Sequence, residues 1–519
     1  MQLEGKSLIG FATSGGGTPF RAADPSNDES LEPAFHNATS DDVARAAQLA
    51  QAAFASYGHA SGKQKGAFLR RIAEGLLAAQ DAIVERAGRE TALPQARLTG
   101  EMARTVGQLR LFATLVEEGS WVDARIDHGD PTRAPIPKPD VRSMQRPLGP
   151  VVVFGASNFP LAFSVAGGDT AAALAAGCPV IVKAHPAHPG TSELVGRVIQ
   201  HAVRESNLHE GVFSLLFDAG YEIGLALVRH PVVKAVGFTG SRTGGRALME
   251  AAAARAVPIP VFAEMSSVNP VVILPGALTK DVKPLATGLH GAVTLGVGQF
   301  CTNPGLVFVP QSADGDRFVD ELATLIGGTA PGTMLTAGIR TSFAAGVEQL
   351  STHAEQRTRV AMAPNRAGAA LFVTDAIALR AKPELAHEVF GPSTVVVRYR
   401  DGADLRETLG GLEGQLTATV HATPDELAAN GDLVALLGEK AGRLLFGGFP
   451  TGVEVCHAMV HGGPYPATSD GRSTSVGTRA ISRFARPLCW QNFPDAALPD
   501  ELREANPLGI SRLVDGKLG

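Results

Sequence analysis

Apolar residues recur every three or four positions through residues 41–120, which is the spacing of amphipathic helices. The segments "DDVARAAQLAQAAFASY" and "GKQKGAFLRRIAEGLLAAQDAIVERA" follow this spacing, and "TGEMARTVGQLRLFATLVEEG" predicts a third helix. Asp41 and Asp42 open the first segment, where negative charge favours a helix N-terminus. Residues 121–150 are richer in Pro, Asp and Arg, so we expect a connecting arm there rather than core.

From residue 150 the pattern changes to short apolar runs separated by helical segments. The runs "PVVVFG", "PVIVKA", "GVFSLLF", "VKAVGF" and "IPVFAE" predict buried strands. Their alternation with helices indicates right-handed βαβ units on a parallel sheet, and therefore the α/β fold class. A second α/β region contains "PVVIL", a helix near 281–295, "LVFVP" and a helix from about 315, with a further strand at "RLLFGG".

The 519 residues exceed what one hydrophobic core accommodates, so we expect roughly two or three domains. A formal net charge of -5 gives no reason to expect nucleic acid or an anionic membrane as a partner. "MQLEGKSLIG" lacks the apolar core of a secretion signal, and no window holds about 18 consecutive apolar residues. These features predict a cytoplasmic protein.

The four cysteines are Cys178, Cys301, Cys456 and Cys489, without CxxC spacing or an accompanying histidine cluster. We therefore expect neither a disulfide framework nor a metal site. Cys301 differs from the others because "GVGQFCTNPG" surrounds it with small residues that would expose backbone amides. The thiol is either a small buried hydrophobe at a turn, which is the commoner case, or a nucleophile.

Three polar residues, Asn158, Lys183 and Ser241, follow the ends of predicted strands, where parallel sheets bind ligands. Ser241 lies at a helix start with Gly240 and Gly245, an arrangement that suits a phosphate group. No GxGxxG follows the first strand and no Walker lysine is present, so this turn alone does not establish nucleotide binding.

Glu264 ends the apolar strand "IPVFAE", where it either caps the next turn or acts as a general base. A carboxylate whose pKa is raised by an apolar pocket could serve a cysteine nucleophile. The backbone amide of Cys301 and the side chain of Asn158 could then form an oxyanion hole.

These words occur in a particular order: Asn-Phe-Pro, a strand-end Lys, Phe-Thr-Gly-Ser, a strand-end Glu, Gly-Gln-x-Cys and "HEVFGP". The order resembles the aldehyde dehydrogenase superfamily from about residue 35 to 495. The resemblance implies a Rossmann-like nucleotide-binding domain, an α/β catalytic domain and a small β oligomerisation arm. The expected segments are 1–124 (N-terminal helical part of the nucleotide-binding domain), 125–148 (arm), 149–265 (nucleotide-binding domain), 266–470 (catalytic domain) and 471–519 (C-terminal segment returning to the arm).

The resemblance also implies roles for the residues named above. Cys301 would attack the aldehyde, Asn158 and the Cys301 amide would stabilise the oxyanion, and Glu264 would activate the water that hydrolyses the thioester. The implied cofactor-binding residues are Lys183 at the adenosine ribose, Gly240, Ser241 and Gly245 at the pyrophosphate, Glu388 at the nicotinamide ribose, and Phe390 beside it.

One departure concerns the cofactor. Members that prefer NAD commonly carry a glutamate three residues after the strand-end lysine, and here that position is Pro186. Without a carboxylate there, a 2′-phosphate is not repelled, so we expect NADP, with NAD as the other usable cofactor. His185 and His188 either contact that phosphate or belong to a solvated loop. After Glu264 the usual Leu-Gly-Gly is replaced by Met-Ser-Ser.

Within the superfamily, "GQFCTNPG", "FPTGVEVCHAMVHGGPYPATSD" and "RFARPLCWQNFP" resemble the 2,5-dioxovalerate (α-ketoglutarate semialdehyde) dehydrogenases. Such a substrate carries a carboxylate, so its tunnel should hold a cation. Arg104 is the candidate anchor, because a guanidinium grips a carboxylate with two hydrogen bonds, and a solvated helix arginine is the alternative. Phe159 and Phe163 are expected to line the tunnel, residues 451–457 and His461 to close it, and Arg472 to join two loops.

Four other functions compete with this one. A long-chain fatty aldehyde dehydrogenase would want an apolar residue at position 104, and a CoA-acylating enzyme would lack the base at position 264. A catalytically silent scaffold would not need to retain Cys301, Asn158, Glu264 and Lys183 together. A cofactor-free thiol hydrolase needs a histidine partner, and the sequence places none near Cys301.

We expect a homodimer or homotetramer in which strands around 125–148 and 481–494 pair.

Overall fold

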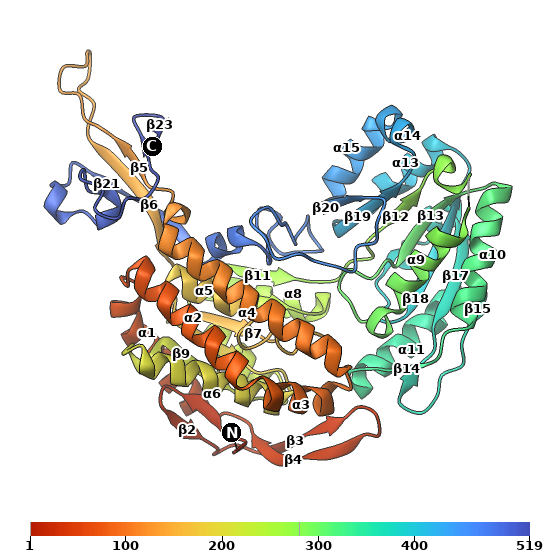
Figure 1. Cartoon of the computed structure of the whole chain (residues 1–519), viewed down its shortest axis with the longest axis horizontal. Helices are drawn as coiled ribbons and strands as arrows, with labels where there is room; N and C mark the ends of the chain where they lie inside the picture. Colours follow the sequence, from red (N-terminus) through yellow and green to blue (C-terminus); the bar gives the residue numbers. More distant parts are fainter. Residues whose placement is uncertain (1, 280) are drawn as a thin grey trace.

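The chain folds around two largely parallel β-sheets, and the computed structural model describes residues 2–279 and 281–519 (Figure 1). The first sheet has the strand order β11-β10-β7-β8-β9-β1-β2. Its parallel strands are β7 (Val151–Phe154), β8 (Val180–Lys183), β9 (Phe213–Leu216), β10 (Ala235–Thr239) and β11 (Val261–Glu264). All five predicted runs form these strands, which confirms the α/β class.

The N-terminal 36 residues contain strands that the sequence pattern did not reveal. β1 (Ser7–Ile9) pairs antiparallel with β9 and with β2 (Ala12–Ser14), while β3 (Pro19–Asp24) and β4 (Glu29–His36) form a hairpin. The segment 1–124, expected as the N-terminal helical part of the nucleotide-binding domain, therefore begins with strands that precede its helices. A three-residue strand is too short for a detectable alternation, and β1 forms because it adds to β9 of an existing sheet.

Helices cover both faces of the first sheet, and the three predicted over residues 41–120 become four. These are α1 (Ser40–Tyr57), α2 (Gly62–Ala78), α3 (Gln80–Thr91) and α4 (Gln95–Glu118). Thr39 caps α1 with Asp42 in a reciprocal capping box. The later helices are α5 (Gly168–Ala176), α6 (Pro189–Glu205), α7 (Glu222–Arg229) and α8 (Arg242–Ala253).

The second sheet has the strand order β15-β17-β18-β13-β12-β19-β20. Its strands are β12 (Val271–Ile273), β13 (Leu306–Pro310), β15 (Glu355–Arg359), β17 (Ala370–Asp375), β18 (Ser393–Tyr399), β19 (Gln415–His421) and β20 (Ala441–Phe446). The helices of this half are α9 (Lys283–Thr294), α10 (Ala313–Gly327), α11 (Ala337–Ser351), α12 (Ala376–Ala381), α13 (Gly402–Gly410), α14 (Pro424–Ala429) and α15 (Gly431–Lys440). A small pair, β14 (Gly332–Thr333) and β16 (Arg366–Ala367), lies beside them.

A third, five-stranded sheet projects away from the rest of the molecule (Figure 1). In it β6 (Val141–Pro147) pairs antiparallel with β21 (Ala485–Gln491), which lies about 340 positions later in the chain. β5 (Arg125–Asp127), β22 (Leu513–Val514) and β23 (Lys517–Leu518) complete this sheet. The predicted pairing of the two distant segments is therefore present within one chain. Among the described residues, no helix has both the length and the apolar character needed to cross a membrane.

The order of the first sheet determines where a ligand can bind. β8 lies on one side of β7 and β10 lies on the other, so the chain reverses its direction of winding between β7 and β10. Ligands of open α/β sheets bind beyond the carboxyl ends of the strands at such a point. Asn158, Lys183, Ser241 and Glu264 all lie at these carboxyl ends, which brings the predicted polar residues to one edge.

Candidate active site

Cys301 follows a turn with an uncommon backbone conformation. The preceding turn has positive φ at Gly296, Val297 and Gly298, with values of 55°, 59° and 65°. A Cβ on Gly298 would lie 2.3 Å from the carbonyl group of Gly391, so no other residue fits there. The cysteine loop consequently packs directly on the segment that carries Glu388.

The side chain of Asn269 fixes the Cys301 loop by hydrogen bonds, and the sequence analysis did not identify this residue. Its side-chain Nδ2 donates to the carbonyl oxygens of Cys301 and Asn303, both at 2.9 Å, and Asn269 is fully buried. Its Oδ1 accepts from the hydroxyls of Thr417 and Ser267, both at 3.0 Å. An asparagine before a proline reads as an ordinary turn in the sequence, so no local signal identified it.

The tertiary structure brings a histidine against both the thiol and the acid. His461 Nε2 lies 3.5 Å from Cys301 Sγ and 3.0 Å from Glu264 Oε2. Ser475 Oγ donates to the same Glu264 oxygen at 2.7 Å. His461 therefore contacts the candidate nucleophile itself, which the sequence analysis did not foresee when it assigned this residue only to closing the tunnel. The statement that Cys301 has no well-placed histidine partner was wrong, because the two residues are 160 positions apart.

The electrostatics of the three groups are coupled. Burial, together with the neighbouring Glu264 charge, raises the pKa of the Cys301 thiol well above its usual value. Burial alone would raise the pKa of Glu264, but the His461 charge and hydrogen bonds from His461 and Ser475 outweigh it and lower that pKa. The expectation of a raised pKa at Glu264 was therefore wrong, because the pocket around the carboxylate is polar.

Asn158 points at the nucleophile loop, as an oxyanion-hole residue must. Its Nδ2 donates to the carbonyl oxygen of Gln299 at 3.0 Å, which leaves the second amide hydrogen for another acceptor. The segment after Asn158 is held by Glu101 of α4, whose Oε1 accepts from the amides of Leu161 and Ala162, both at 2.9 Å. Glu101 is a second positioning residue that the sequence analysis missed.

Arg104 lies on α4 and faces this site. Its guanidinium stacks over Phe163 at 5.0 Å, and the Phe163 ring lies 6.3 Å from that of His461. Neither terminal nitrogen of Arg104 has a hydrogen-bond partner in the described part of the chain, although both are buried. Burial lowers the pKa of this guanidinium, while the charges of Glu101, Cys301 and Glu264 oppose that shift.

Aromatic residues and a cavity accompany Arg104. Phe159 packs edge-on against Phe163 at 5.1 Å and against Phe300 at 5.5 Å, and Arg97 stacks over Phe159 at 4.5 Å. The cavity has a volume of about 590 Å³. It is lined by Ala103, Arg104, Gly107, Arg110, Leu111, Thr114, Val453, Glu454 and Val455. Residues 453–455 of this lining belong to the segment 451–457 that was expected to close the substrate tunnel.

The predicted cofactor residues form a cradle at the ends of β8 and β10. Lys183 Nζ donates to the carbonyl oxygen of Asp218 at 2.7 Å, and burial lowers the pKa of Lys183 to about 8. Ser241 caps α8 by accepting from the amide of Gly244 at 3.2 Å. A Cβ on Gly240 would lie 2.6 Å from the Phe238 ring. This glycine-lined helix N-terminus with an adjacent lysine fits the pyrophosphate and ribose of a dinucleotide.

Other residues complete the cradle. A Cβ on Gly245 would lie 2.5 Å from Met265 Sδ, so this glycine allows α8 to approach β11 closely. Glu388 and Phe390 are half-buried on the segment that packs against the cysteine loop. Burial raises the pKa of Glu388 to about 7, and hydrogen bonds from Ser266 and Ser267 oppose that rise.

Two sequence interpretations need correction here. His188 is fully buried and its Nε2 lies 2.8 Å from the carbonyl oxygen of Ala156, so it belongs to neither a solvated loop nor a phosphate site. His185 stacks on it with ring centroids 5.4 Å apart. Arg472 does not join two loops, because its side chain pairs with Asp470 two positions earlier and is otherwise exposed.

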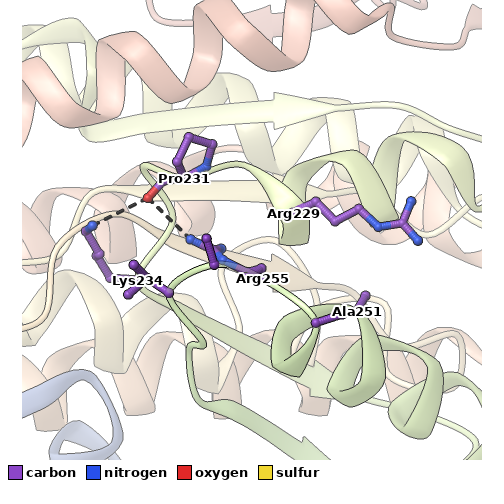
Figure 2. A pocket seen from close by; sticks show the side chains of 8 residues that line it. Arg229, Pro231, Lys234, Ala251 and Arg255 are labelled. Atoms are coloured by element: carbon purple, nitrogen blue, oxygen red, sulfur yellow. Dashed lines mark hydrogen bonds between the residues drawn. The ribbon is translucent and has the colours of Figure 1, made fainter.

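A second cavity, of about 360 Å³, lies elsewhere (Figure 2). It includes Arg229, Lys234 and Arg255, and Lys234 immediately precedes β10, at the opposite end of that strand from Ser241. Arg255 and Lys234 both donate to the carbonyl oxygen of Pro231, as Figure 2 shows. Lys234 and Arg255 therefore stabilise the turn at Pro231 and do not extend the cofactor cradle.

Comparison with known proteins gives a consistent result. Residues 11–430 match the model of the aldehyde dehydrogenase family. The protein named alpha-ketoglutaric semialdehyde dehydrogenase 2 from Azospirillum brasilense is 53% identical over 523 residues, covering 100% of both chains. Alpha-ketoglutaric semialdehyde dehydrogenase from Acinetobacter baylyi is 47% identical over 93% of each chain. The solved structure of betaine aldehyde dehydrogenase from Staphylococcus aureus in complex with NAD+ has a TM-score of 0.82 at 18% identity, over 95% of this chain and 96% of that one, which shows a shared fold.

Proposed function

The chain belongs to the aldehyde dehydrogenase family, and on this basis we propose that it oxidises 2,5-dioxovalerate (α-ketoglutaric semialdehyde) to 2-oxoglutarate with NADP or NAD. The observation that carries the substrate is the guanidinium of Arg104 beside Phe163 and the Cys301 site, whose two buried terminal nitrogens have no partner within residues 2–279 and 281–519. A buried cation without a partner is costly unless a ligand supplies the counter-charge. The relatives that bear this activity in their names support the same substrate.

The first chemical step uses the cysteine loop. The ionised carboxylate of Glu264, which hydrogen-bonds to the Cys301 thiol, takes its proton and releases it to solvent. The resulting thiolate attacks the aldehyde carbon and forms a thiohemiacetal. The second amide hydrogen of Asn158 and the backbone amide of Cys301 are the donors for the resulting oxyanion. With a hydrogen on Nε2, His461 donates towards Glu264 and lies close enough to Sγ to stabilise the thiolate.

When bound, the nicotinamide supplies the hydride acceptor that turns the thiohemiacetal into a thioester. The residues of this chain that would hold the cofactor are Lys183, Gly240, Ser241, Gly245, Glu388 and Phe390. Glu264 then takes a proton from the water that attacks the thioester, and its lowered pKa keeps it ionised and ready at neutral pH. Hydrolysis releases the acid and restores the Cys301 sulfur.

Side chains on helix α4 would orient the bound substrate. The dioxovalerate carboxylate would accept two hydrogen bonds from Arg104, and the aromatic pair of Phe159 and Phe163 would pack on its carbon chain. Arg104, Gln108 and Glu101 lie on one buried face of the helix, and both amide atoms of Gln108 lack partners among the described residues. This polar face favours an acidic aldehyde over a long apolar one.

The cofactor preference is a finer question, and we infer NADP. Pro186 occupies the position where a glutamate would repel a 2′-phosphate, and the buried Lys183 provides a positive charge nearby. His188 does not contribute, since it is buried in the loop itself.

We also infer a homodimer or homotetramer assembled through the projecting arm. β21 leaves alternate side chains exposed, and Trp490 and Met144 belong to an apolar cluster at the base of the arm. β21 is also an edge strand of this sheet, and its unpaired backbone groups are available to pair with a second copy of the chain.

Initial rates of NADPH and NADH formation with 2,5-dioxovalerate, succinic semialdehyde and decanal test the proposal. We expect the highest kcat/KM for dioxovalerate. A preference for decanal would instead identify a long-chain fatty aldehyde dehydrogenase and leave the cysteine chemistry intact.

A further inference from the structure

Three donor atoms of different chemical type converge at the nucleophile: the sulfur of Cys301, the imidazole Nε2 of His461 and a carboxylate oxygen of Glu264. All lie within 4.8 Å of one another. We propose that these residues form a reversible, inhibitory binding site for a thiophilic divalent cation such as Zn²⁺. The site is independent of which aldehyde the enzyme oxidises.

The spacing of the donors suits one metal ion. Ligand atoms on a tetrahedral zinc, with bonds of about 2.0–2.3 Å, lie roughly 3.3–3.6 Å apart. The Sγ–Nε2 separation is 3.5 Å and the Nε2–Oε2 separation is 3.0 Å, so two of the three pairs are already close to this spacing. Thiolate, imidazole and carboxylate are also the three side-chain ligands that zinc takes in proteins.

The surroundings leave room for binding. Glu264 Oε1 is buried and has no hydrogen-bond partner within residues 2–279 and 281–519, so the carboxylate has an oxygen free for a cation. Oε2 can keep its bond from Ser475, and only its contact with His461 Nε2 is given up when Nε2 binds the metal. Cys301 is half-buried, in contrast to His461 and Glu264, and gives the cation access to the sulfur. A water molecule entering from the side of Cys301 would be the fourth ligand of the metal ion, beside the three protein ligands.

The same geometry explains why binding should be reversible. A metal-bound histidine normally donates its other ring N–H to an acceptor, which orients the ring and strengthens the ligand. His461 Nδ1 has no such acceptor among the described residues, yet it would carry the hydrogen once Nε2 binds the metal. The thiol proton leaves at the same time, and the occupied sulfur cannot attack an aldehyde.

The test is a titration of the full-length, cofactor-free protein with Co²⁺, which reports ligation by absorption. We expect a sulfur-to-cobalt charge-transfer band together with the intense visible bands of tetrahedral Co²⁺, both displaced by Zn²⁺. Zn²⁺ should inhibit dehydrogenase activity, and a chelator should restore it. Cys301→Ser should abolish the charge-transfer band, whereas Cys489→Ser, which alters an exposed thiol on β21, should leave it unchanged.

His461→Ala should raise the Co²⁺ dissociation constant at least tenfold, and Glu264→Gln should weaken binding independently if the histidine variant does not fold. Unchanged Co²⁺ affinity in folded His461→Ala or Glu264→Gln would mean that the thiol alone binds the metal, and would overturn the proposal. Loss of the band in Cys489→Ser would overturn it as well. Because the readout is metal binding, failure of the proposed aldehyde oxidation would not affect the result.

Discussion

The side-chain amide of Asn269 donates a hydrogen bond of 2.9 Å to the carbonyl oxygen of Cys301. Asn269 lies two residues before β12 of the second sheet, in the half that also carries the Cys301 loop. Asn158 follows β7 of the first sheet and donates to the Gln299 carbonyl of the same loop. The catalytic loop therefore depends on both sheets keeping their relative positions.

Replacing Asn269 by alanine should damage both activity and stability. The variant leaves the carbonyl oxygens of Cys301 and Asn303 without this donor, and two lost buried bonds cost about 2–4 kcal/mol of unfolding free energy. We expect kcat to fall at least tenfold and denaturant midpoints to shift downward. Asn492→Ala is the control, since Asn492 also has a positive φ but is exposed on the arm. Equal losses in both variants would contradict a specific role at the loop.

Glu264→Gln should separate hydride transfer from hydrolysis. The amide keeps the shape of the side chain but cannot take a proton from water, so the thioester on Cys301 should persist. Rapid mixing should show a burst of reduced cofactor close to one equivalent per site, followed by turnover at least about 100-fold slower. A steady rate without a burst would exclude Glu264 as the base for deacylation.

Arg104→Met should weaken substrate binding and increase the stability of the protein. The substitution removes a buried cation that has no partner in the described chain, so the melting temperature should rise. The KM for dioxovalerate should increase by about tenfold to a hundredfold, the equivalent of about 1.5–3 kcal/mol for bonds between charged groups, while decanal oxidation is spared. Arg317→Met, which alters an exposed arginine on α10, is the matched control. An unchanged KM for dioxovalerate would remove Arg104 from the substrate site.

NADP affinity should weaken as the pH rises through about 8. The pKa of Lys183 in the free protein is about 8, so the ammonium is charged below this pH and neutral above it. An anionic cofactor favours the charged form, and binding therefore loses up to about a factor of ten between pH 7 and pH 9. Fluorescence titration of NADPH at several pH values measures this. Lys183→Met should bind weakly at every pH, and a retained pH dependence in that variant would point to another group.

Pro186→Glu should turn the enzyme towards NAD. A carboxylate at this position would repel a 2′-phosphate, and we expect kcat/KM with NADP to fall at least tenfold while kcat/KM with NAD holds or improves. The ratio of the two values is the measurement. A ratio unchanged by the substitution would show that the 2′-phosphate lies away from residue 186.

The sequence by itself determined the parts that depend on short-range order. Apolar runs between residues 150 and 264 predicted the five parallel strands because each run is buried on both sides and must be apolar throughout. The carboxyl ends of these strands then placed Asn158, Lys183, Ser241 and Glu264 at one edge, since parallel strands end together.

Only the tertiary structure decided which distant residues meet at the nucleophile. His461 reaches Cys301 from 160 positions away, and Asn269 holds the Cys301 carbonyl through a bond that no local pattern encodes. The pKa of Glu264 was predicted in the wrong direction for the same reason. A strand-end carboxylate after an apolar run suggests an apolar pocket, but its real neighbours are an imidazole and a hydroxyl that the fold brings in from residues 461 and 475. Short-range patterns specify which residues lie on a strand, whereas hydrogen bonds and charges act between whatever residues packing brings together.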